Sequence, residues 1–69
     1  MHILVIDGQG GRLGKQLIES INRTFPQAEI TAVGTNSIAT AAMLRAGAAQ
    51  GATGENPVVV ASKQADIIV

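Results

Sequence analysis

A continuously apolar run near the start of the chain, HILVI at residues 2–6, ends at an aspartate and a glycine-rich loop, DGQGGRLG at 7–14. After His2 the run holds only aliphatic, mostly β-branched residues, which is typical of a strand buried on both faces of a parallel sheet. Parallel strands need a crossover connection, and this connection is usually a helix. The feature therefore predicts a sheet covered by helices, which is an α/β fold.

A helix is predicted over residues 11–24, because apolar residues recur there at helical spacing. This apolar face consists of Leu13, Leu17, Ile18, Ile21 and Phe25. Polar residues fall on the opposite side, and Pro26 ends the helix.

A second strand and helix follow in the same order. The run AEITAV at 28–33 predicts the strand. One of Thr35, Asn36 or Ser37 is expected to cap a helix that continues to about residue 46, and Gly47 stands where a left-handed C-cap is favoured.

The last third of the sequence is more ambiguous. AAQGATG at 48–54 predicts a short strand and a glycine-containing loop, and Asn56-Pro57 predicts an N-cap with proline at the first helical position. VVVA at 58–61 has the composition of a strand. The alternating order nevertheless favours a helix at 57–64, since ADIIV at 65–69 is again typical of a buried strand.

Alternation of strand and helix implies right-handed crossovers and a parallel sheet. The expected fold is Rossmann-like α/β, with flanking helices and one incomplete βαβαβ half, in a single partial domain at 1–69. A chain of 69 residues buries a small core, so support from a partner is expected.

Composition argues against several classes of partner. Five Lys and Arg balance five Asp and Glu, and Phe25 is the only aromatic residue, so neither a basic footprint nor a stacking platform for nucleic acid is present. No apolar stretch approaches about 20 residues and the first residues do not resemble a signal peptide, so we expect a cytoplasmic protein without membrane contact. Without Cys, and with His2 as the only His, no metal site is expected.

Three small polar loops are expected to meet at the carboxyl edge of the sheet, where ligands bind in open α/β folds. These loops are residues 7–14, 34–37 and 51–56. The candidate binding residues are Gly8, Gly10, Gly11, Arg12, Leu13, Gly14, Thr35, Asn36, Thr53, Gly54, Glu55 and Asn56.

Gly8, Gly11 and Gly14 have the G-x-x-G-x-x-G spacing, similar to that of extended short-chain dehydrogenases. Gly8 would allow the turn out of the strand, Gly11 the approach of a pyrophosphate, and Gly14 close packing of helix on strand. The stricter G-x-G-x-x-G pattern fails at Leu13. The alternative interpretation is a close-packed turn that binds nothing.

Ordinary dinucleotide binding is disfavoured, so NAD or NADP is expected to bind weakly. The second strand is followed by Gly34, Thr35 and Asn36 rather than by an acidic residue for the ribose. Only Arg12 could reach a 2′-phosphate. Asp7 would repel an anion, and we expect it instead to accept hydrogen bonds from the N–H groups of its own loop.

Other catalytic patterns are incomplete. A P-loop would need Gly at position 9 and Ser or Thr at position 16, and both positions hold Gln. Ser37 and Ser62 have no histidine partner suited to nucleophilic catalysis. The sequence therefore identifies no catalytic residue.

Three segments, VIDGQGG-x-x-GK, GTNSIATAAMLRAGA and GATGENPVVV…ADIIV, together resemble a family of small bacterial proteins known as domain of unknown function 3842. The resemblance extends over essentially the whole chain. It implies a Rossmann-like protein without an assigned activity, whose members continue past ADIIV, and it groups the candidate residues into one site. On this basis the chain is expected to be the amino-terminal part of such a protein.

The leading hypothesis is a nucleotide- or anion-binding module with its phosphate site at residues 7–14 and a small phosphorylated ligand. One alternative is part of an enzyme whose catalytic residues lie outside this chain. The other is a non-catalytic, self-associating or scaffold protein. Association as a homo-oligomer, or with the rest of its own polypeptide, is expected to involve residues 58–69.

Overall fold

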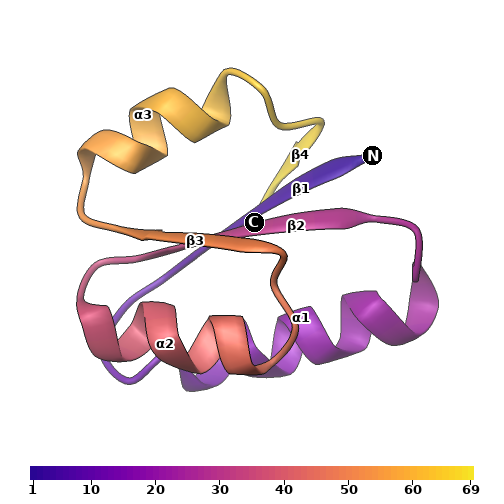
Figure 1. Cartoon of the computed structure of the whole chain (residues 1–69), viewed down its shortest axis with the longest axis horizontal. Coiled ribbons are helices and arrows are strands. Elements are labelled where there is room, and N and C mark those ends of the chain that lie inside the picture. The colour runs from indigo at the N-terminus through magenta and orange to yellow at the C-terminus, as the bar shows by residue number, and fades with distance from the viewer.

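The computed structural model describes all 69 residues. Strands and helices alternate along the chain (Figure 1). The elements are β1 (His2–Asp7), α1 (Arg12–Thr24), β2 (Glu29–Gly34), α2 (Ser37–Arg45), β3 (Gln50–Thr53), α3 (Asn56–Ser62) and β4 (Ile67–Ile68).

The four strands form one all-parallel sheet in the order β3-β2-β1-β4. β1 pairs with β2 over its whole length, from His2 beside Glu29 to Asp7 beside Gly34. The chain first moves outward from β1 to β3 and then crosses back to place β4 on the other side of β1. This topology confirms the predicted Rossmann-like α/β fold.

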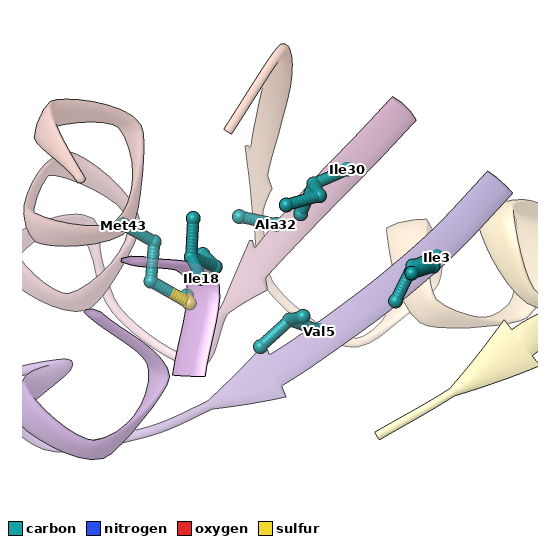
Figure 2. Packing of buried hydrophobic residues seen from close by; sticks show 6 residues of the cluster. All are labelled: Ile3, Val5, Ile18, Ile30, Ala32 and Met43. Carbon is teal, nitrogen blue, oxygen red and sulfur yellow. The ribbon is translucent and has the colours of Figure 1, made fainter. Parts of the chain in front are cut away.

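Helices cover both faces of the sheet. α1 and α2 lie on one face and α3 on the other (Figure 1). The main core lies between the sheet and the pair α1 and α2, and Figure 2 shows its residues pointing toward one another. These residues are Ile3, Val5, Ile18, Ile30, Ala32 and Met43.

The predicted apolar face of α1 is only partly correct. Ile18 is fully buried, whereas Leu13 is 72% exposed and Phe25 is 58% exposed. Gly14 is the other buried residue of the helix, so the face toward the sheet begins one residue later than expected. Phe25 is the C-cap, with a backbone outside the helical region, and therefore leaves the helical periodicity.

The second helix has the caps that the sequence predicts. The side chain of Asn36 accepts a hydrogen bond from the Ala39 N–H, which makes Asn36 the N-cap. Gly47 has a φ of 116° after the helix end, a conformation that favours glycine.

The third helix is confirmed, with a shifted start. α3 begins at Asn56, so Glu55 rather than Asn56 is its N-cap, and no side chain completes the cap. Residues 58–61 have the composition of a strand but form a helix, because the chain must cross here from β3 at one edge of the sheet to β4 at the other. None of the three helices is both long enough and apolar enough to cross a membrane.

The prediction of a buried strand at residues 65–69 is wrong with respect to burial. Ile67, Ile68 and Val69 are 44%, 53% and 51% exposed. The strand pairing itself is present, and the Val69 N–H donates to the Leu4 carbonyl at 2.8 Å. The reason for the exposure is topological, because β4 is an edge strand with only one neighbour.

Candidate functional site

The carboxyl ends of three strands lie level at one edge of the sheet. Asp7 pairs with Gly34, and Gly34 pairs with Thr53, so the loops that follow β1, β2 and β3 leave from the same edge. The first two loops are joined directly, since the Asn36 side-chain amide donates to the Gln9 carbonyl at 2.8 Å. The sequence-predicted convergence of these loops is therefore present in the backbone.

Two glycines of the first loop are required by packing. A Cβ on Gly11 would lie 2.7 Å from the Ala39 carbonyl oxygen, and the φ of Gly11 is 74°. A Cβ on Gly14 would lie 2.6 Å from the Met43 sulfur. That Cβ would also lie 3.0 Å from the Asp7 Cβ, so Gly14 has its expected role in packing the helix on the strand, whereas a Cβ on Gly11 would point at α2.

The other two glycines differ from each other. A Cβ on Gly8 would lie 2.9 Å from the Thr35 hydroxyl oxygen, so the second loop restricts this position. A Cβ on Gly10 would meet nothing within 4 Å, and its φ is not positive. Gly10 is therefore the one glycine of this loop that neither neighbouring atoms nor a left-handed backbone explains.

The Asp7 side chain links the two ends of the loop by hydrogen bonds. Its carboxylate accepts the Gly8 N–H at 2.8 Å and the Gly14 N–H at 2.6 Å. This confirms the expectation that Asp7 serves the N–H groups of its own loop. A ligand consequently cannot use the N–H of Gly14.

Several donors at the start of α1 remain free. The Gly11 N–H donates to the Gly8 carbonyl, but those of Gly10, Arg12 and Leu13 have no acceptor. Gly11 is left-handed and Arg12 begins the helix, a succession that turns neighbouring N–H groups toward one concave side. The positive end of the helix dipole lies at the same place.

A cavity of about 510 Å³ lies at these donors. It is open to solvent, and its lining is mostly polar or glycine. The lining residues are Asp7, Gly8, Gln9, Gly10, Arg12, Leu13 and Gln16. Leu13 supplies its one large apolar side chain, which explains why this residue does not join the core.

The remaining predicted residues do not line the cavity. Thr35 is exposed beside Gly8, and Asn36 is engaged at both ends of its side-chain amide. The Thr53 hydroxyl, at the end of β3, lies 2.8 Å from the Thr40 hydroxyl of α2.

The segment Gly54 to Asn56 leads into α3 and also stays outside the cavity. Since β3 is two strands from β1, its end is displaced by roughly 10 Å from the end of β1. Of residues 7–14, the structure thus places all but Gly11 and Gly14 around one cavity, with Asn36 supporting the loop. Gly11, Gly14 and residues 53–56 lie outside the cavity.

Besides Asp7, two cavity residues were not among the predicted binding residues. Gln9 has a φ of 50°, unusual for a residue with a side chain, and its carbonyl is held by Asn36. Gln16 lies one helical turn after Arg12 and Leu13 on the same side of α1. Helical spacing from the loop could have identified Gln16, whereas nothing in the sequence marks the backbone of Gln9.

The titratable side chains form no recognisable catalytic or metal-binding group. No cluster of three or more His, Asp or Glu side chains is placed to hold a metal ion. The cavity presents unpaired N–H donors and the Arg12 side chain beside the Asp7 carboxylate.

Comparison with known proteins gives one match. The model of a family described as Domain of unknown function (DUF3842) matches residues 2–69. No curated protein and no solved structure matches the chain.

Proposed function

The chain belongs to this family of unknown function, and we propose that it binds a small phosphorylated molecule at the loop of residues 7–14. A nucleotide is one candidate class of ligand. The phosphate would lie against the N–H groups of Gly10, Arg12 and Leu13, within reach of the Arg12 side chain.

One observation carries the proposal: free N–H groups at the positive end of α1 line a cavity beside a glycine that packing does not require. Helix starts with free donors favour anions, because partial positive charge and hydrogen-bond donors coincide there. The bare backbone of Gly10 leaves room for an oxygen atom to approach these donors closely.

Asp7 is compatible with this proposal despite its charge. Both carboxylate oxygens already accept N–H groups, at 2.8 Å and 2.6 Å. Hydrogen bonds of this kind stabilise the carboxylate where it is. The cation of Arg12 lies on the same cavity and offsets the negative charge near the phosphate.

Adenine dinucleotides are expected to bind only weakly. The residues after β2 offer no carboxylate for ribose hydroxyls. Asn36 carries no negative charge, and its side chain is already held in the loop, because its amide N–H donates to Gln9 and its oxygen accepts from Ala39.

Titration of the isotopically labelled chain with inorganic phosphate, ADP and NAD, followed by amide NMR, tests the proposal. We expect phosphate and ADP to shift the amide signals of Gly10, Arg12 and Leu13 before those of other residues. Gly10→Val should abolish these shifts without unfolding the chain, since its side chain would enter open space in front of the donors.

Ala49→Val is the matched control, because Ala49 is exposed and lies outside the cavity. It adds a similar volume and should leave the titration unchanged. Unaltered binding by a folded Gly10→Val variant would exclude this loop as the phosphate site.

A second candidate function, self-association, is favoured by a different observation. Large apolar side chains are exposed on α3, on β4 and at the residue that follows β4. They are Val59, Val60, Ile67, Ile68 and Val69. An exposed apolar edge strand is a template for pairing with another chain, and a second copy can supply the same strand.

A further inference from the structure

A second hollow, which we call the basic groove, lies between α1 and α2. It has a volume of about 450 Å³ and is lined by Gly10, Arg12, Lys15, Glu19, Ala42 and Arg45. Three of the five basic residues of the chain lie here with one carboxylate. The chain as a whole has no net charge, so this groove is a local concentration of positive charge.

These three cations have no partners within the protein. The one contact between a basic and an acidic side chain within ion-pair distance joins His2 and Glu29, at 3.6 Å, and involves none of the three. No hydrogen bond involves the side chain of Arg12, Lys15 or Arg45. Even Glu19, which follows Lys15 by one helical turn, forms no ion pair with it. The positive charge of the groove is therefore available to an external anion.

The basic groove adjoins the cavity of the glycine-rich loop. Gly10 and Arg12 line both hollows, so a ligand held at the loop can extend into the groove past a residue without a side chain. Arg45 enters the groove from the last turn of α2. Parallel packing of α1 and α2 brings it there, because the Gly11 and Gly14 contacts hold the two helices close together.

We propose that the ligand carries at least two phosphate groups, one at the loop and the next in the basic groove, bound by Arg12, Lys15 and Arg45. This inference rests on the proposed function and narrows its ligand to a bisphosphate or polyphosphate compound. Arg12 stands between the two phosphates, and its fork of N–H donors suits contact with both. Lys15 and Arg45 bind only the second phosphate.

Isothermal titration calorimetry with inorganic phosphate and inorganic tripolyphosphate tests this arrangement on the whole chain. We expect tripolyphosphate to bind at least about tenfold more tightly than phosphate, since it adds charge-assisted contacts. Arg45→Gln should weaken tripolyphosphate binding about five- to tenfold and leave phosphate binding nearly unchanged. Lys15→Gln should act in the same direction.

Arg23→Gln provides the matched control, because Arg23 is an exposed residue in the last turn of α1 that lines neither hollow. It removes the same charge and should change both affinities by less than about twofold. An equal loss in Arg45→Gln and Arg23→Gln would overturn the inference, because overall charge alone would then explain the preference.

The failure of the inference can be distinguished from failure of the proposed function. Suppose that Gly10→Val abolishes phosphate binding, but that Arg45→Gln and Lys15→Gln leave the preference for tripolyphosphate intact. This result would overturn only the role of the basic groove. If neither phosphate nor tripolyphosphate binds to the unmodified chain, both the proposed phosphate site at the loop and the proposed role of the basic groove are wrong.

Discussion

At the residue scale, the loop between β1 and α1 contains glycines in very different surroundings. Gly11 is left-handed and faces the backbone of Ala39, and Gly14 faces Met43. Gly10 faces open space. The first two glycines hold α1 against its neighbours, whereas the third leaves the mouth of the cavity unobstructed.

This difference predicts opposite results for two alanine substitutions. Gly11→Ala should lower the free energy of unfolding by roughly 2 kcal/mol or more, because it combines a left-handed residue with a backbone clash. Gly10→Ala should change it by less than about 0.5 kcal/mol. Urea unfolding of the two variants measures both values, and similar losses would show that the loop does not have this conformation in solution.

The Asp7 carboxylate provides a second prediction at this scale. Asp7→Asn should destabilise the chain by about 1 to 3 kcal/mol, because the amide group cannot accept one of the two N–H bonds. Glu19→Gln, at a carboxylate without a hydrogen bond, is the matched control and should have little effect. Equal midpoints for both variants in urea unfolding would contradict the role given to Asp7.

The role of Asp7 and a cap at one of residues 35–37 could be predicted from the sequence, because both depend on hydrogen bonds within short segments. The choice of Asn36 among the three needed the structure. The contact of Gly11 with Ala39 could not be predicted. It depends on how α2 lies against α1, and no local pattern contains that information. For the same reason the sequence assigned the close approach of a pyrophosphate to Gly11, although Gly10 was also among the candidate binding residues.

At the element scale, α3 is the least securely packed helix. It has no buried residue, whereas α1 has two and α2 has four. A gap of about 220 Å³ separates it from the sheet, with Leu4, Ala52 and Ala61 among its lining residues. Few buried contacts imply that α3 opens at a lower free energy than the rest of the fold.

Hydrogen exchange measures this difference. Amides of α3 should exchange faster than those of α1 and α2, and Ala61→Leu should slow them by filling part of the gap, with a gain of about 0.5 to 2 kcal/mol. Ala41→Leu, at a half-buried position of α2 outside this gap, is the control and should not protect α3. Equal protection of all three helices in the unmodified chain would contradict this account.

The order of elements could be predicted because each long segment has a clear hydrophobic period. Their burial was less predictable. An apolar run such as residues 65–69 has the same composition in a central strand and at an edge, so only the topology determines whether it is covered. The strand-like composition of residues 58–61 shows the same limit, since these residues form a helix.

At the scale of the whole molecule, the two faces of the sheet are unequally covered. Two helices with a packed core cover one face, and the single helix α3 covers part of the other. The exposed apolar residues of α3 and β4 lie where this coverage is weakest. A second copy that covered them would remove apolar surface from water, which favours association.

Sedimentation velocity over a range of concentrations tests this expectation. Copies of the chain should associate, and Ile68→Lys should shift them toward the monomer by placing a charge on the exposed strand. Ile38→Lys is the matched control, because Ile38 is also exposed, at 69%, but lies on α2. Association that both variants reduce equally, or a chain that is monomeric throughout, would argue against an interface at β4.

The position of β1 between β2 and β4 has a consequence for how the protein forms during translation. β1 is synthesised before any other strand, yet the N–H of Asp66 must return to the carbonyl of His2 before its second edge is paired. Until residues 66–69 have emerged from the ribosome, the central strand keeps an open side. The open side of β1 is therefore exposed to mispairing until residues 66–69 are available to pair with it, and these residues complete the protection of the strand that was made first.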